Sequence, residues 1–164
     1  CVEQTPAGVP VAVVNLQGTV FMSPLDNPFR KADEVLAEIA EAHPEVELIL
    51  VDFHAEATSE KVAMGWHLDG RVTAVLGTHT HIPTADAEVL PGGTGYLTDL
   101  GMCGPTDSVI GVRKQQAINR FVTRLPAPFQ VAKDRVRLQG ALITADAVSG
   151  RCLAIEQRSW PAEG

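Results

Sequence analysis

Apolar residues gather in short, almost unbroken runs along this chain, and these runs predict strands. The first strands are expected over residues 9–16, 46–51, 72–76 and 95–98. Only Glu47 interrupts the second run, which is typical of a strand covered on both faces of a parallel sheet. We expect the strand over residues 9–16 to be buried as well.

Between these runs, apolar positions recur at the spacing of an α-helix. Asn27 and Pro28 form a helix start signal, and the apolar face that follows ends before Pro44. A short helix is expected over residues 59–66, closed by Asp69-Gly70, and another over residues 113–124. Strand, helix and strand in this order favour a parallel pair joined by a crossover, and therefore an α/β fold.

The last part of the chain predicts strands alone. They are expected over residues 129–132, 136–145 and 152–157, and Ser149-Gly150 supplies the turn of an antiparallel hairpin. Gly92 to Gly95 does not connect a strand to a helix, so we interpret it as a hairpin turn and not as a phosphate-binding loop. We expect one α/β domain over residues 1–164.

Three histidines follow two of the apolar runs. His54 ends one run, and His79 and His81 follow the next within Gly77-Thr78-His79-Thr80-His81. Residues two apart in an extended segment point the same way, and parallel strands deliver their carboxyl ends to one edge of the sheet. Because imidazole is the commonest side-chain ligand of transition metals, these histidines predict a metal site at that edge.

Three histidines allow two kinds of metal site. One is a mononuclear zinc site with an open water position, and the other is half of a dinuclear site, which needs a bridging carboxylate. Asp52 is a candidate bridge, although a partner that orients an imidazole is the favoured interpretation. For Glu56, three roles remain open: a metal ligand, a hydrogen-bond acceptor for an imidazole, or a solvated loop charge.

Other reactive side chains have simpler interpretations. His43 suits a charge partner at a helix C-terminus, and His67, beside Trp66, suits a structural role, with lining of the site as the alternative. Cys103 lies in a glycine-rich loop without an evident base, so we assign it no catalysis.

Charge and cysteine content narrow the class of protein. The chain has 13 basic and 20 acidic residues and no basic cluster, which argues against an extended nucleic-acid surface. Its apolar runs are too short to cross a membrane. Three widely spaced cysteines argue against a disulfide framework and favour a reducing compartment, so we expect a cytoplasmic protein.

Four segments resemble the YmdB-like family of bacterial metallophosphoesterases, within the calcineurin-like superfamily. They are Val14–Gly18, Asp52–Lys61, Gly77–His81 and Thr98–Met102. The resemblance implies part of a four-layer αββα sandwich. It also implies hydrolysis of small phosphodiesters, notably 2′,3′-cyclic nucleotides, by a hydroxide bound to two divalent ions. Iron or manganese is implied, zinc being possible, with His54, His79 and His81 as metal ligands.

The family's amino-terminal motifs, an early Gly-Asp, a Gly-Glu-Asn and a Gly-Asn-His, do not occur here. The chain therefore resembles the carboxyl-terminal portion of the family domain, and we assign it no catalytic residue. Activity is expected to require the amino-terminal half, so that this chain alone is inactive, and a homo-oligomer is expected. A non-catalytic metal-binding or interaction module and a mononuclear zinc hydrolase are the alternatives.

Overall fold

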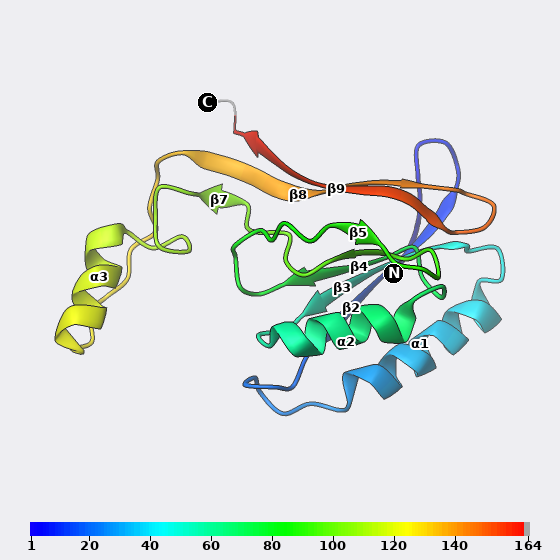
Figure 1. Ribbon diagram of the computed structural model, residues 1–164, viewed down its shortest axis with the longest axis horizontal. Coiled ribbons are helices and arrows are strands. Elements are labelled where there is room, and N and C mark those ends of the chain that lie inside the picture. Colours follow the sequence, from blue (N-terminus) through cyan, green and yellow to red (C-terminus); the bar gives the residue numbers. More distant parts are fainter. Residues whose placement is uncertain (163–164) are drawn as a thin grey trace.

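The computed structural model describes residues 1–162 and contains two sheets with two helices packed on one side (Figure 1). The larger sheet has the order β1-β2-β3-β4-β6-β5. Its four inner strands run parallel, and β1 and β5 pair antiparallel at the edges. The strands are β1 (Val2–Gln4), β2 (Pro10–Gln17), β3 (Leu48–His54), β4 (Ala74–Thr78), β5 (Glu88–Val89) and β6 (Gly95–Leu97).

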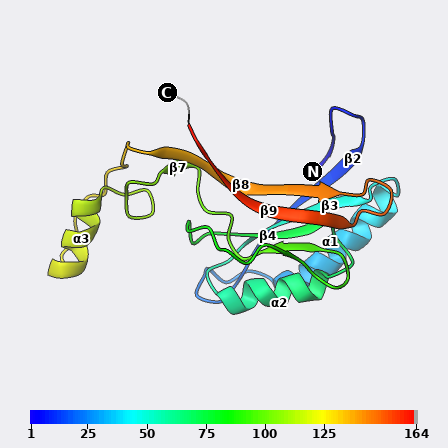
Figure 2. The same cartoon turned by 45° about the horizontal axis from the view of Figure 1, so that its top comes forward.

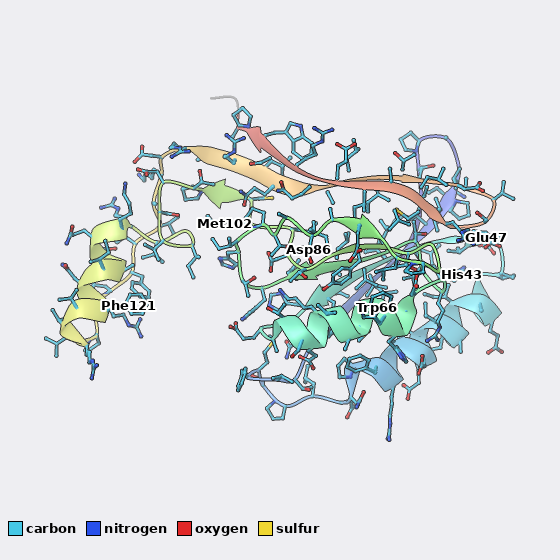
Figure 3. The ribbon with its side chains drawn as sticks, in the orientation of Figure 1. His43, Glu47, Trp66, Asp86, Met102 and Phe121 are labelled. Atoms are coloured by element: carbon cyan, nitrogen blue, oxygen red, sulfur yellow. The ribbon has the colours of Figure 1, made fainter. Side chains whose placement is uncertain are left out.

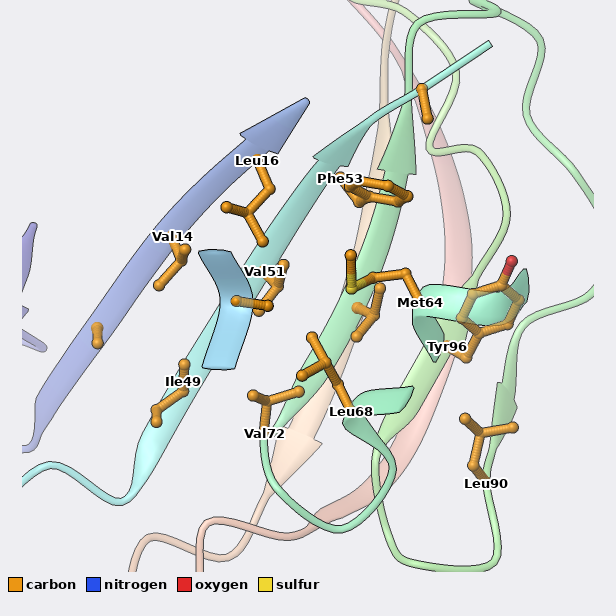
Figure 4. Packing of buried hydrophobic residues seen from close by; sticks show 14 of the residues in the cluster. Val14, Leu16, Ile49, Val51, Phe53, Met64, Leu68, Val72, Leu90 and Tyr96 are labelled. Atoms are coloured by element: carbon orange, nitrogen blue, oxygen red, sulfur yellow. The ribbon is translucent and has the colours of Figure 1, made fainter. Parts of the chain in front are cut away.

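Helices α1 (Pro28–Ala42) and α2 (Thr58–Leu68) cover one face of this sheet. Asn27 caps α1 as predicted, because its side chain accepts hydrogen bonds from the first amides of the helix. Phe53 of β3 and Met64 and Leu68 of α2 belong to one buried apolar cluster, and none of the three is exposed (Figure 4). No helix within residues 1–162 is both long and apolar enough to cross a membrane.

A second sheet lies on the opposite face of the first (Figure 2). It consists of β7 (Gly104–Pro105), β8 (Val136–Ala145) and β9 (Cys152–Pro161), all antiparallel. Cys152 and Ile155 pack against Leu97 of the larger sheet. The layer order helix, sheet, sheet, together with the carboxyl-terminal hairpin, confirms the predicted α/β class and its place in an αββα sandwich. The predicted domain runs to residue 164, and residues 163–164 lie outside the described part.

The predicted strand over residues 129–132 is wrong. Val131 forms one isolated bridge with Val112, and among residues 1–162 no strand pairs with this segment over a longer stretch. The bridge consists of two backbone hydrogen bonds, from Arg113 to Gln130 and from Ala132 to Gly111. The Gln130 amide donates to the side chain of Gln116 instead of to a strand, so the ladder does not continue. The preceding helix, α3 (Lys114–Thr123), does form, and it stands away from both sheets with Phe121 79% exposed (Figure 3).

Strand β2 is buried on one face only, which corrects the expectation of a fully buried strand. Ala12, Val14 and Leu16 face the helices, whereas Val13 and Asn15 alternate with them and are exposed. The reason is the placement of the hairpin. On the sheet face opposite the helices, β9 packs over β5 and β6 and leaves β2 uncovered. Gly92 to Gly95 lies at the β5–β6 connection, which confirms the predicted hairpin turn.

Candidate metal centre

The carboxyl ends of β3 and β4 bring two of the three predicted histidines into contact. His54 is the last residue of β3 and lies in register with Thr78, the last residue of β4, so His79 begins the adjoining loop. Nε2 of His54 lies 3.0 Å from Nδ1 of His79, and the two rings are nearly perpendicular, at 86°. The predicted convergence at one sheet edge is therefore found for this pair.

The segment that carries His79 and His81 is not extended, contrary to the prediction. His79 has a φ of 101° and His81 a φ of 66°, both in the left-handed region. Between them, Thr80 donates from its amide and its hydroxyl to Asp99, and this pulls the loop out of the strand direction. Backbone of this kind costs about 1–3 kcal/mol per residue and persists only where the surroundings hold it.

His81 has a contact of its own, with the loop that follows β7. Its Nδ1 lies 3.3 Å from the carbonyl oxygen of Ile110. Within residues 1–162, no group of three or more His, Cys, Asp or Glu side chains is arranged to hold a metal ion. The described residues therefore fit a metal in part: His54 and His79 present two imidazole nitrogens to one point.

Two carboxylates lie behind these imidazoles. Asp52 accepts a hydrogen bond of 2.7 Å from Thr78, and the Thr78 oxygen lies 3.0 Å from Nδ1 of His54. The other oxygen of Asp52 accepts from Asn15 at 2.7 Å. Glu56 lies 2.8 Å from Nε2 of His79. Glu56 thus lies directly beside His79, and Asp52 reaches His54 through Thr78; both lie on the outer sides of the rings, as partners of imidazole ligands do.

A buried ion pair beneath the histidine loop was missed by sequence reasoning. Lys61 of α2 lies 2.8 Å from Asp99, and their side chains are 1% and 0% exposed. Burial raises the pKa of Asp99, but hydrogen bonds from Lys61, Thr80 and Gly101 outweigh it and bring the pKa below its ordinary value. The pair fixes Thr80, and with it the loop that carries His79 and His81.

The neighbouring residue, Glu60, anchors a second loop at the same edge. It is 7% exposed and accepts hydrogen bonds from the amide and hydroxyl of Thr19 and from the amide of Val20. Glu60-Lys61 predicted only a helix start in the sequence. The sequence did contain a signal for these buried charges: an acidic and a basic residue stand side by side in a helix that must pack on a sheet.

The other reactive side chains singled out in the sequence, His67, His43 and Cys103, make contacts outside the histidine pair. Nε2 of His67 lies 3.0 Å from Asp33 and the ring packs edge-on against Phe29, which joins α2 to α1. His43 caps the C-terminus of α1, where the sequence had placed it. The thiol of Cys103 is exposed and contacts the backbone of Gln139.

Comparisons with known proteins give a consistent assignment. A family model described as YmdB-like protein matches residues 1–157. A 2′,3′-cyclic-nucleotide 2′-phosphodiesterase of Bacillus subtilis is 51% identical over 150 residues, which is 92% of this chain and 56% of that protein.

Two crystal structures share the fold. One is a hypothetical protein from Thermus thermophilus, with a TM-score of 0.88 and 40% identity over 99% of this chain and 62% of that one. The other is a phosphatase from Mycoplasma pneumoniae, with a TM-score of 0.84 and 36% identity over 98% of this chain and 56% of that one. The chain spans little more than half the length of the relatives it matches. It belongs to the YmdB-like protein family.

Proposed function

We propose that this chain carries part of the active site of a metal-dependent phosphodiesterase that hydrolyses 2′,3′-cyclic nucleotides or related small phosphodiesters. The observation that supports it most is the approach of His54 and His79 at the carboxyl ends of β3 and β4, the usual ligand-binding edge of such sheets. The Bacillus subtilis relative, a 2′,3′-cyclic-nucleotide phosphodiesterase, supports the substrate class.

In this proposal His54 and His79 hold metal through Nε2 and Nδ1, and His81 is the third ligand of the set. Two divalent ions, when bound, supply positive charge that acidifies water and offsets the charge of the phosphodiester. Iron and manganese are the proposed metals. The residues of this chain bind and orient: Glu56 and the Asp52–Thr78 pair keep the two rings in place.

We propose that a further segment completes the site. Three neutral imidazoles cannot offset the charge of two divalent ions. Asp52 already accepts hydrogen bonds from Asn15 and Thr78, and Glu56 lies beside the outer nitrogen of His79. A group able to protonate the leaving oxygen is also needed, and no residue of this chain is proposed for it. The open face of β2 and the shorter length relative to its relatives support a segment outside this chain.

The test is hydrolysis of a 2′,3′-cyclic nucleotide by the complete protein encoded around these residues. His54→Ala and His79→Ala are each expected to lower kcat at least about 1000-fold at matched metal loading. His67→Ala serves as the control, because His67 contacts Asp33 and Phe29 instead of the paired histidines, and its activity should stay near wild type.

Wild-type turnover in either His54→Ala or His79→Ala would overturn the proposal. Residues 1–164 alone are expected to show no turnover with added manganese or iron. Turnover with one zinc per chain would instead favour a mononuclear zinc hydrolase. Metal binding without hydrolysis by the complete protein would favour a non-catalytic module.

We also propose a cytoplasmic location and a homo-oligomer. The three cysteines are free, which suits a reducing compartment. The exposed apolar residues of α3, including Phe121 and Val122, suit contact with another copy. Light scattering of the complete protein would test the oligomer.

A further inference from the structure

A line of side-chain hydrogen bonds leads from the surface of β2 to the imidazole of His54. Asn15 donates to Asp52, Thr78 contacts the other oxygen of Asp52, and His54 contacts Thr78. Strand register builds this line, because Asn15 pairs with Asp52 and His54 pairs with Thr78 across neighbouring strands. The arrangement therefore follows from the sheet itself and not from a movable loop.

The direction of each hydrogen bond in this line is fixed by chemistry. A carboxylate only accepts, and a threonine hydroxyl has a single hydrogen to donate. Thr78 must donate that hydrogen to Asp52, so its oxygen accepts from Nδ1–H of His54. The hydrogen of neutral His54 is thereby kept on Nδ1, and Nε2 keeps a free lone pair.

His79 lies opposite this lone pair. Its Nδ1 is 3.0 Å from Nε2 of His54, so in the absence of metal Nδ1–H of His79 donates to that nitrogen. Its Nε2 lies 2.8 Å from a carboxylate oxygen of Glu56. A metal ion held by Nε2 of His54 would use the lone pair that the hydrogen bond to Thr78 leaves free.

We propose that Asp52, acting through Thr78, is a positioning residue that sets the tautomer of His54 for metal binding, a role that rests on the proposed function. Glu56 lies 2.8 Å from Nε2 of His79, on the outer side of that ring. Glu56 is on a loop and its side chain is 47% exposed, whereas the strand register holds Asp52. Asp52 therefore carries the sharper test.

Asp52→Asn reverses the donor and acceptor roles along this line of hydrogen bonds without changing the shape of the side chain. Because Asn15 donates to one end of the introduced carboxamide, the amide oxygen takes that end and the NH₂ group turns to Thr78. Thr78 then accepts from the carboxamide and donates its own hydrogen to Nδ1 of His54. The hydrogen of His54 moves to Nε2, the nitrogen that the metal needs.

The experiment measures the His54 tautomer by ¹⁵N NMR of the metal-free protein and Mn²⁺ affinity by calorimetry, both on the complete protein. Wild type and Thr78→Ser are expected to carry the hydrogen on Nδ1. Asp52→Asn should carry it on Nε2, and Thr78→Val should lose the preference. Both of these variants should bind Mn²⁺ about 10–100-fold more weakly, while Thr78→Ser stays near wild type.

An unchanged tautomer and affinity in Asp52→Asn would overturn the inference, and Thr78→Val gives an independent reading should Asp52→Asn fail to fold. His54→Ala distinguishes failure of the proposed function from failure of the positioning role of Asp52. If His54→Ala binds Mn²⁺ as wild type does, the proposed function fails. If His54→Ala loses binding while Asp52→Asn and Thr78→Val keep it, the positioning role alone fails.

Discussion

The carboxylate of Asp99 lies 2.8 Å from the ammonium group of Lys61, with both side chains shielded from solvent. The same carboxylate accepts hydrogen bonds from the amide and hydroxyl of Thr80 and from the amide of Gly101. One buried acid therefore joins α2 to the loop between His79 and His81. The left-handed backbone of those histidines depends on this contact.

Lys61→Met is expected to lower the free energy of unfolding by about 3–5 kcal/mol, because it leaves a charged Asp99 buried without its cation. Adding Asp99→Asn should recover part of this loss, since the remaining amide is neutral. Urea denaturation of the two single variants and the double variant gives the coupling energy.

The matched control is Lys114→Met on α3. Lys114 lies 2.9 Å from Asp107, but the two side chains are 55% and 36% exposed, so the loss should not exceed about 1 kcal/mol. Equal losses in Lys61→Met and Lys114→Met would contradict the importance given to burial.

Acid should weaken the Asp99 contact in a defined pH range. The folded-state pKa of Asp99 lies below the ordinary 3.8, so its contribution to stability is complete above 3.8 and is lost as the pH falls through the folded value. The difference in unfolding free energy between wild type and Asp99→Asn should be constant above about pH 5 and should shrink below the ordinary pKa. A difference that stays constant down to about pH 2 would argue against an ionised Asp99 in the native state.

Periodicity predicted the elements that build the sheet, since strands β2, β3 and β4 and helices α1 and α2 each bury a continuous apolar run or face. It failed for residues 129–132, where an apolar segment finds no neighbouring strand. Short edge strands such as β5 have two residues and no run to detect. Whether such a segment becomes a strand depends on a pairing partner that is distant in the sequence.

At the candidate site, the histidines could be predicted from their place after apolar runs, but their geometry could not. His79 and His81 depart from the strand direction because Thr80 binds Asp99, nineteen residues farther along the chain. Asp52 reaches His54 only through Thr78 of another strand. Side chains that meet across strands are invisible to spacing along one segment.

Gly77→Ala should disturb the histidine loop from within β4. A Cβ at Gly77 would collide with the backbone carbonyl oxygen of Thr98, so β4 and the segment that follows β6 must separate. We expect a loss of at least about 2 kcal/mol in unfolding free energy, together with weaker Mn²⁺ binding because His79 follows two residues later. Thermal unfolding and calorimetry would measure the two effects.

Gly140→Ala is the control for this substitution. Gly140 lies in the middle of β8, and nothing lies within 4 Å of its added Cβ. Because glycine weakens a strand interior, this variant should be neutral or stabilising by up to about 1 kcal/mol. Comparable damage in both variants would mean that the contact with Thr98 is not the cause.

Glu60→Gln tests whether the second anchor of α2 holds the loop after β2. The Thr19 amide and hydroxyl donate to one oxygen of Glu60, and the Val20 amide donates to the other at 3.3 Å. A carboxamide can keep the two bonds to Thr19, but its NH₂ group then faces the Val20 amide, and two donors repel. Stability should fall by about 1–3 kcal/mol.

Hydrogen exchange locates this effect. The Val20 amide should lose protection more than the Thr19 amide, whereas Glu41→Gln on the exposed side of α1 should change neither. The loop begins beside His54, because the Gly18 amide donates to the His54 carbonyl oxygen at 2.9 Å. Faster exchange at Val20 in Glu60→Gln would therefore show that α2 orders the site edge from both sides, through Glu60 on this loop and through Lys61 on the histidine loop. Unchanged protection at Val20 would leave that ordering to Lys61 alone.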